Sequence, residues 1–507
     1  MTPAPASRLD DPAWTWRAAL GLGVALAALR VTALFATSLE LYPDEAQYWL
    51  WSRALHWGYV SKPPMIAWLI RLTTALGGDG EAWVRLSAPV LHLAAMLALY
   101  GAGRRLYGPR AGLLAATLYG LMPAVQISAL FIATDAPLMA FLAPALLAYV
   151  ALWRADAPAG RRRAAAAFGL LLGLAFLAKY AAVFLVIGVG VHALVDRDAR
   201  RAWTGGAWIA ALAGFAVVAG PNLAWQAGHR FATVTHTAEV NAHWTASRLI
   251  NPGKLAEFVL GQFGVMGPIP FAVLIGGAIV LGARRALQPA DRLLLCLALP
   301  PLVLVSLQAL ISRAHAHWAA TGYLAGVVLV AGWLTRWRAG AWTWLAIGLQ
   351  AAVAAVVLAV VAAPSLVDAS GNGRRLARLR GWRDTAAITS AAARAVMARG
   401  GLSATAVEDR YLFNELAYYG RADFGRRGSI RLRMRPPAHA ALSEAELASP
   451  LRRGEAGRVL IAETPGKPGQ PLLPTDFAAV RPIGRWTVVA GKRPRDLVLA
   501  LASGYRR

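Results

Sequence analysis

Long apolar stretches recur through the first 363 residues, separated by short segments that carry Arg, Pro and polar side chains. A helix needs roughly 20 mainly apolar residues to cross a bilayer core of about 30 Å, so each stretch is a candidate membrane span. The pattern predicts eleven spans, at residues 17–37, 86–103, 111–131, 137–153, 164–178, 180–195, 203–223, 264–282, 292–311, 318–335 and 341–363.

The apolar region between residues 164 and 195 has two interpretations. Lys179 stands in its middle, and a charge inside a bilayer is costly unless it reaches water or a partner, which favours a break at this lysine. One long tilted helix is the alternative, and it would reverse the orientation of every later span.

The distribution of Lys and Arg sets the orientation, because basic residues stay on the cytoplasmic side of membrane proteins. With the N-terminus inside, the inner connections hold most of the arginines of residues 1–363, whereas the outer loops 38–85 and 224–263 together carry seven basic residues. Eleven spans then place the C-terminus outside. Asp10 and Asp11 precede the first span, which argues against a cleaved signal peptide and predicts a retained anchor.

Residues 364–507 are much less apolar and contain strand-like runs at 458–463 and 486–490. The sequence therefore predicts two domains. The first, residues 1–363, is an all-α polytopic membrane domain, and the second, residues 364–507, is a small α+β extracytoplasmic domain.

The composition agrees with a membrane protein, since 57% of the residues are hydrophobic and 15% are charged. The formal net charge of +26 points to anionic partners, and the apolar runs favour membrane lipids or phosphate-bearing substrates over nucleic acid. The single cysteine, Cys296, excludes an intrachain disulfide framework, a Cys-based zinc site and an iron–sulfur cluster.

The first outer loop carries two adjacent carboxylates, Asp44 and Glu45, just beyond the first span. If residues 43–55 form a short helix on the membrane, both carboxylates occupy its first turn and the aromatic side chains lie at headgroup depth. The alternative is structural, with Asp44 as the helix N-cap and Glu45 as a partner of the helix dipole.

Two more ionisable residues are predicted on the same side. Lys62 precedes Pro63 and Pro64, and a basic side chain on a rigid turn suits a phosphate, although a Pro-started helix with a solvated lysine is the alternative. Asp135 stands at the outer end of the third span, where a charge is costly unless it faces water or a partner. Its Thr-Asp-x-Pro context is equally typical of a helix start.

Further cations face this side, namely Lys179, Arg248, Lys254 and Arg313. Together they would hold a phosphate through charge-assisted hydrogen bonds, whereas each alone is explained as a headgroup anchor.

Histidines give a weaker signal. His315 and His317, with Glu45 or His243, are a candidate for a divalent metal, so a metal stays an open alternative and no other cofactor is indicated. The motifs of nucleotide hydrolysis, dinucleotide redox chemistry, zincin-type proteolysis and the Gly-x-Ser-x-Gly elbow are absent from the sequence.

These features together resemble the bacterial family 39 type of polyprenyl-phosphate-dependent membrane glycosyltransferases. That group includes protein O-mannosyltransferases, lipid A aminoarabinose transferases and lipopolysaccharide galacturonosyltransferases. The resemblance covers roughly residues 17–363 and is carried by the acidic pair, the Lys-Pro-Pro turn and the Asp that opens the fourth span. It implies the C-type glycosyltransferase fold, in which a lipid-phosphate sugar enters from the bilayer and the acceptor arrives from outside.

The resemblance also implies catalytic roles. Asp44 matches the family's catalytic carboxylate, Glu45 its acidic neighbour and Asp135 the second acidic position. In an inverting displacement, Asp44 would accept the proton of the acceptor hydroxyl as it attacks the anomeric carbon.

Residues that bind the substrate follow from the same resemblance. Lys62 matches the lysine near the donor phosphate, and it would stabilise the departing polyprenyl phosphate with help from Lys179 or Arg313. Tyr48 or Trp49 would stack on the sugar. The predicted substrate-binding residues are Tyr48, Lys62, Lys179, Arg248, Arg313 and His317.

The acceptor is less well defined. Residues 373–507 carry 25 Lys or Arg against 11 Asp or Glu, which favours lipid A or lipopolysaccharide at the outer face of a bacterial inner membrane. Transfer to a protein or another envelope glycan is the alternative with the same chemistry. A transporter or flippase of an anionic lipid and a non-catalytic assembly subunit are the alternatives of other classes.

Overall fold

The computed structural model describes residues 7–237, 250–425, 428–437, 441, 443–455, 457–465, 473–490 and 493–507. The chain divides into two compact units. The helical unit comprises Met1–Phe35, Lys62–Ile66 and Arg85–Leu358. The α+β unit comprises Ala36–Ser61, Ala67–Val84 and Ala359–Arg507.

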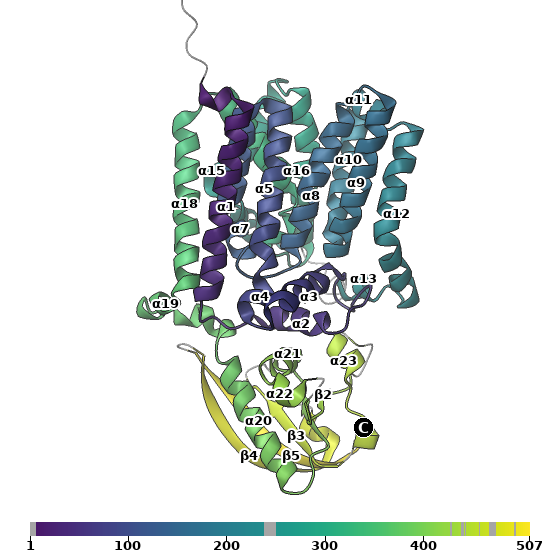
Figure 1. The fold of residues 1–507 in the computed structure, drawn as a ribbon, viewed down its shortest axis with the longest axis vertical. Helices are drawn as coiled ribbons and strands as arrows, with labels where there is room; N and C mark the ends of the chain where they lie inside the picture. Colours follow the sequence, from purple (N-terminus) through teal and green to yellow (C-terminus); the bar gives the residue numbers. More distant parts are fainter. Residues whose placement is uncertain are drawn as a thin grey trace, which may run out of the picture. The chain divides into compact units, whose positions relative to one another are not determined.

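The helical unit is a bundle in which α9 packs against both α8 and α12, and Figure 1 shows these helices running side by side with α5 and α10. Its helices are α1 (Pro12–Ala36), α5 (Ser87–Tyr107), α6 (Pro109–Leu121), α7 (Pro123–Ser128), α8 (Asp135–Trp153), α9 (Pro158–Ala178), α10 (Val183–Val195), α11 (Arg197–Ala202), α12 (Gly205–Gly228), α13 (Ala232–His236), α14 (Pro252–Val265), α15 (Pro268–Ala283), α16 (Pro289–Ile311), α17 (Gly322–Arg336) and α18 (Gly340–Ala362).

Among the described residues, six helices are long and apolar enough to cross a membrane, and α14 with α15 forms a bent pair that counts as a seventh. All eleven predicted stretches overlap helices, but Tyr180–Val195 and Gly322–Arg336 are short and α6 has only 13 residues. The prediction of a multi-pass membrane protein is confirmed, and the count of eleven spans stays a prediction.

The break predicted at Lys179 is confirmed. Helix α9 ends at Ala178, the backbone of Lys179 is extended with φ −162° and ψ 135°, and a short 3-10 helix leads into α10. The break lets the lysine leave the apolar helix and reach a carboxylate, as its charge requires.

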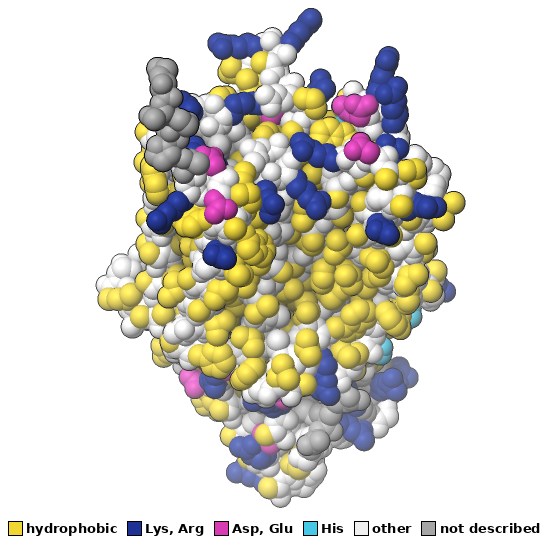
Figure 2. Space-filling model, turned by 45° about the horizontal axis from the view of Figure 1, so that its top comes forward, with side chains coloured by type: hydrophobic (Ala, Val, Ile, Leu, Met, Phe, Trp, Pro, Cys, Tyr) yellow, Lys and Arg dark blue, Asp and Glu magenta, His cyan; other side chains and the backbone are white. Residues whose placement is uncertain are grey.

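The two ends of the helical unit differ in charge. Arginines lie at the last turn of α5, directly after α8, in the first turns of α9 and on α11, which all belong to one end. Figure 2 shows a broad surface of hydrophobic side chains with Lys and Arg gathered at its upper edge. The opposite end holds the start of α8 and the end of α9.

The α+β unit contains one five-stranded sheet in the order β2-β1-β3-β5-β4. Strand β1 pairs in parallel with β2 and β3, whereas β5 is antiparallel to β3 and β4. The two predicted strand-like runs fall in β3 and β4 and are confirmed. The strands are β1 (Ala404–Val407), β2 (Leu432–Met434), β3 (Val459–Glu463), β4 (Phe477–Ala490) and β5 (Arg493–Tyr505).

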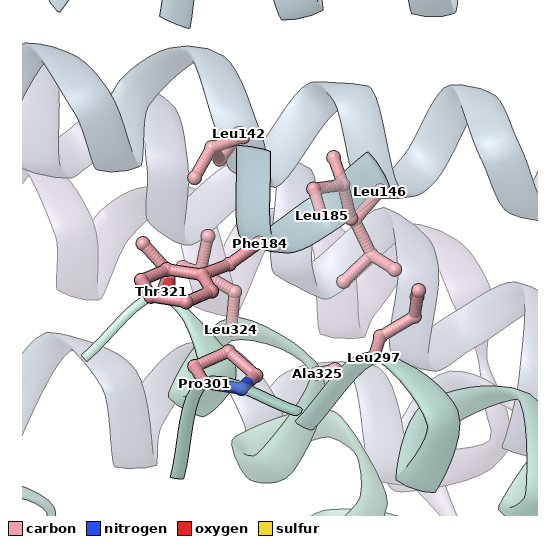
Figure 3. A pocket seen from close by; sticks show the side chains of 9 residues that line it. All are labelled: Leu142, Leu146, Phe184, Leu185, Leu297, Pro301, Thr321, Leu324 and Ala325. Atoms are coloured by element: carbon pink, nitrogen blue, oxygen red, sulfur yellow. The ribbon is translucent and has the colours of Figure 1, made fainter. Parts of the chain in front are cut away.

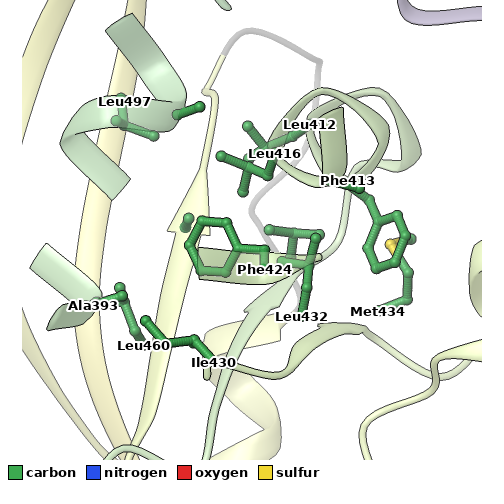
Figure 4. Close-up of a cluster of buried hydrophobic side chains, with 14 of the residues drawn as sticks. Ala393, Leu412, Phe413, Leu416, Phe424, Ile430, Leu432, Met434, Leu460 and Leu497 are labelled. Carbon is green, nitrogen blue, oxygen red and sulfur yellow. The ribbon is translucent and has the colours of Figure 1, made fainter. Parts of the chain in front are cut away.

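Helices cover one face of this sheet and form the main core of the unit. Alternate residues of β3 point to opposite faces, so Leu460 and Ala462 join this core while Val459 and Ile461 join a second cluster. Figure 4 shows Leu412, Leu416 and other core side chains meeting the sheet. The helices of the unit are α19 (Ser365–Ala369), α20 (Trp382–Ala398), α21 (Arg410–Tyr419), α22 (Arg421–Phe424) and α23 (Glu444–Ala448).

The first outer loop also belongs to the α+β unit, through α2 (Pro43–Ser52) and most of α3 (Met65–Gly77) and α4 (Glu81–Arg85). Helix α2 packs on α21, and the Trp49 ring meets Tyr418 edge-on with centroids 4.9 Å apart. The Glu40 carboxylate accepts from the backbone N–H of Trp382 at 2.6 Å. The loop is thus built into the same core as the C-terminal segment.

Candidate functional site

Charged side chains meet at the end of the helical unit where α8 begins and α9 ends. Because the two helices are consecutive and antiparallel, Asp135 at the first position of α8 lies beside Lys179 at the C-cap of α9. Lys179 Nζ donates to Asp135 Oδ1 at 2.8 Å, and both side chains are 20% exposed. The two predicted site residues therefore form a half-buried ion pair.

Two more predicted residues join this ion pair. His317 lies on a short 3-10 helix, Ala316–Ala319, between α16 and α17, and Lys62 precedes Pro63 at the turn before α3. Both interact electrostatically with Asp135. The helical unit thus brings together Lys62, Asp135, Lys179 and His317, which we call the polar cluster.

Desolvation shifts the two imidazoles at the polar cluster, those of His315 and His317, toward their neutral forms, because it lowers the pKa of each. The His317 side chain is accessible to solvent, yet enough protein surrounds it to desolvate its charged form, which lowers its pKa to about 4 despite the attraction of Asp135. Lys179, His315 and Lys62 add to this lowering. The pKa of His315, whose ring stacks on His317, is also lowered by desolvation first and then by Arg313 and Lys179. The lysines are therefore the cations of the cluster, with one carboxylate to balance them.

In the α+β unit, the two carboxylates of the first outer loop have different environments. Glu45 is 2% exposed, and its Oε2 accepts from the backbone N–H of Tyr42 at 2.9 Å. Tyr42 is the N-cap residue of α2, so Glu45 closes the helix start from its third position. Asp44 is half-buried and is not the N-cap. The helix-capping role that the sequence offered as an alternative is therefore filled by Glu45, and not by Asp44.

Asp44 interacts electrostatically with two arginines that the sequence did not single out, Arg378 and Arg410. Arg378 donates to the Tyr42 hydroxyl at 2.8 Å, and this bond, with Tyr411 and Asp44, raises the pKa of Arg378. Burial works against the charge of Arg410, but Tyr411, Asp44 and Tyr48 outweigh it and raise its pKa. Their only sequence signal is the basic excess of the C-terminal segment.

The two aromatic residues predicted to stack on a sugar are packed inside the α+β unit. Tyr48 is 5% exposed and contacts Trp51, with ring centroids 5.4 Å apart. Trp49 donates from its indole N–H to Asp79 Oδ1 at 2.8 Å. Arg53, the residue after α2, binds the same carboxylate oxygen at 2.9 Å, so Asp79 contacts both residues.

Other predicted residues are not assembled. Arg313 is exposed, and Arg248 lies outside the described residues, as does His243. Within the described part of the chain, no group of three or more His, Cys, Asp or Glu side chains is arranged to hold a metal ion.

An apolar gap between α8, α10, α16 and α17 is lined by side chains that include Leu146, Phe184 and Pro301 (Figure 3). Its volume of about 10 Å³ is of the order of one water molecule, so it is a packing gap rather than a binding site.

Comparison with known proteins gives a family match over part of the chain and one relative at 40% identity. Residues 61–225 match the family described as dolichyl-phosphate-mannose-protein mannosyltransferase. The chain is 40% identical over 316 residues to the lipid A galacturonosyltransferase RgtD of Rhizobium johnstonii, an alignment over 61% of this chain and 64% of the relative. The chain thus spans less than two thirds of that relative.

Two solved structures resemble the whole chain. They are those of ArnT from Cupriavidus metallidurans, bound to undecaprenyl phosphate and in the apo state, with TM-scores of 0.62 and 0.59. Both cover 95% of this chain and 97% of the other, at 18% and 19% identity. At this identity the likeness shows a shared fold.

Proposed function

We propose that the chain is a membrane glycosyltransferase of the GT-C type, which transfers a sugar from a polyprenyl-phosphate donor to lipid A or lipopolysaccharide. The observation that carries this proposal is the polar cluster, which ends a bundle of apolar helices with two lysines and one carboxylate. A lipid phosphate needs this combination, an apolar surface for its chain and cations for its head.

The polar cluster is the donor-phosphate site in this proposal. Lys62 and Lys179 bind the phosphate, and Asp135 holds the Lys179 ammonium by its bond of 2.8 Å. Their charges stabilise the phosphate as its bond to the anomeric carbon breaks and negative charge grows on the leaving oxygen. His317 is neutral at pH 7 and offers a hydrogen bond rather than a charge.

Asp44 is the general base in this proposal. Glu45 closes the start of α2 through its bond to the Tyr42 N–H, whereas Asp44 is half-buried and interacts electrostatically with Arg378 and Arg410. The acceptor O–H gives its proton to Asp44, its oxygen bonds to the anomeric carbon, and the polyprenyl phosphate leaves with the bonding electrons. One such displacement inverts the anomeric carbon.

The acceptor and the side of the membrane are further parts of the proposal. The identity to a lipid A galacturonosyltransferase supports a lipid A acceptor and a hexuronic acid as the sugar, and the basic excess of residues 373–507 supports the acceptor. The arginines at the other end of the bundle support a cytoplasmic location for that end of an inner-membrane protein, with the active face outside. A protein acceptor is the second candidate, favoured by the family description that residues 61–225 match.

The test is mass spectrometry of lipid A, core oligosaccharide and secreted glycoproteins from cells that carry the wild type, Asp44→Asn or Asp198→Asn. Asp198 is exposed on α11 and is the matched control. We expect the Asn variant at position 44 to lose roughly 10² to 10⁴ in transfer rate, because an amide cannot accept the proton.

The readout separates the parts of the proposal. A hexuronic acid that disappears from lipid A supports donor, base and acceptor together. An unchanged lipid A with a lost glycan on a protein refutes the acceptor. Near wild-type transfer by a folded Asp44→Asn variant refutes the base.

A further inference from the structure

A large cavity lies within the α+β unit, between α2 with the loop after it and the segment formed by α21, α22, β2 and α23. Its volume of about 550 Å³ falls in the range of roughly 300 to 1,000 Å³ that is typical of small-molecule sites. The proposed base Asp44 is not among the residues that line the cavity, and the proposed donor site does not use it.

The floor of the cavity is apolar. Phe413, Phe424, Ile430 and Leu432 line it and belong to the main core of the unit, and Figure 4 shows these side chains packed together. The opposite wall is aromatic, with the rings of Trp51 and Tyr59 stacked at 4.5 Å between centroids. Rings and aliphatic groups on both sides suit the C–H faces of a sugar.

Basic side chains also line the cavity. Arg53, Arg410, Arg431 and Arg433 line it against one carboxylate, that of Glu444. Arg53 is paired with Asp79, and Glu444 accepts from the backbone N–H of Val60 at 3.1 Å. Over the whole lining, four guanidinium groups stand against one carboxylate, and guanidinium groups match phosphate and carboxylate geometry and bind them through paired hydrogen bonds.

We propose that this cavity binds an anionic saccharide, with its ring on the apolar floor and its phosphate or carboxylate on the arginines of β2 and its flank. Arg410 lines the cavity and also interacts electrostatically with Asp44, so this arginine connects the cavity to the proposed base. On the proposed function, on which this assignment rests, the saccharide is the headgroup of the acceptor glycolipid. The cavity thus selects acidic acceptors.

The test measures binding to the purified full-length protein in detergent, without donor, by the fluorescence of the tryptophans at the cavity. The probes are a deacylated glucosamine disaccharide bisphosphate, the same disaccharide without phosphates, and galacturonic acid. The phosphorylated probe reports a phosphate ligand and galacturonic acid a carboxylate ligand. We expect at least one acidic probe to bind about tenfold or more tightly than the neutral disaccharide.

The variant is Arg431→Gln with Arg433→Gln, and the matched control is Arg481→Gln, an exposed arginine of β4 outside the cavity. We expect the double variant to weaken binding of the acidic probe by about tenfold or more, and the control to leave it unchanged. An unchanged unfolding temperature shows that the double variant is folded.

Three results would overturn the assignment: no binding of either acidic probe, equal binding of the neutral disaccharide, or undiminished binding by the folded double variant. Failure of the proposed function has a different signature. Saccharide binding without any sugar transfer leaves the cavity assignment intact and refutes the enzyme, whereas transfer without binding refutes only the cavity.

Discussion

At the scale of single residues, neighbouring carboxylates have separate tasks. The sequence places Asp44 and Glu45 side by side and offers catalysis or helix capping for the pair. The position of each residue in the helix distinguishes these two roles. A side chain at the third helical position can reach back to the N–H of the N-cap residue, whereas one at the second position cannot. Glu45 makes that bond at 2.9 Å, a detail that depends on where α2 begins.

The arginines near Asp44 were beyond sequence reasoning. Arg378 and Arg410 are separated from Asp44 by more than 300 positions, and no local periodicity links residues so far apart. By contrast, the sequence singled out Asp135 and Lys179, since charges at or within apolar spans need water or partners, and Lys62, because it precedes two rigid prolines.

The carboxyl group of Glu463, at the end of β3, should make the stability of the fold depend on pH. Burial, followed by the nearby Glu408 carboxylate, raises the pKa of Glu463 to about 7. Because the folded-state pKa lies above the unfolded value, the folded state holds the proton more tightly. Stability from this group is therefore greatest below about pH 4.5 and is lost as pH rises through 7.

We expect Glu463→Gln, which keeps the shape and removes the charge, to raise the unfolding temperature at pH 8 and to change it little at pH 5. The gain at pH 8 is on the order of 1 kcal/mol after allowance for solvent screening, because the side chain is only half-buried. Thermal unfolding in detergent at both pH values checks it, with Asp198→Asn as the control. Equal shifts at pH 5 and pH 8 would contradict the assignment of the titrating group.

At the scale of elements, charge and proline predict helix boundaries well, and bends less well. Lys179 marked the end of α9 correctly. The bend of 117° between α14 and α15 was not foreseen, and α14 occupies part of what the sequence presented as an outer loop. Gly267 stands at this bend with φ +100°, a conformation that other residues rarely adopt.

Close packing between α9 and α12 gives a prediction at this scale. A Cβ added at Gly169 would lie 2.0 Å from the carbonyl oxygen of Ala211, whereas a Cβ at Gly190 on α10 would meet open space. Small residues let membrane helices approach this closely.

We expect Gly169→Ala to destabilise the protein by about 1 to 3 kcal/mol, because the clash with the α12 backbone forces the helices apart. Gly190→Ala is the matched control and should be neutral or stabilising by up to about 1 kcal/mol, since Ala is the better helix former. Thermal unfolding of both variants in the same detergent measures the difference. A Gly169→Ala variant as stable as the control would mean that α9 and α12 are not in this contact.

At the scale of the whole molecule, the class of fold was predictable and the assembly of the α+β unit was not. Apolar length and the Lys and Arg distribution give a multi-span bundle followed by a small domain. They do not indicate that the first outer loop joins the C-terminal sheet through contacts such as Leu41 N–H to the Tyr419 hydroxyl, at 2.7 Å. Such contacts depend on packing between distant segments, which hydrophobic periodicity does not encode.

The eleven-span topology gives the last prediction. With Cys296 replaced by Ala, single cysteines at Arg161, Arg284 and Arg507 can be labelled in intact cells by a maleimide that does not cross the inner membrane. We expect protection at Arg161 and Arg284, because the inner connections carry the basic excess, and labelling at Arg507. Permeabilised cells, in which all three positions should react, are the control. Protection of Arg507 in intact cells would require an even number of spans, and it would place the basic C-terminal segment on the cytoplasmic side, away from any acceptor on the outer face.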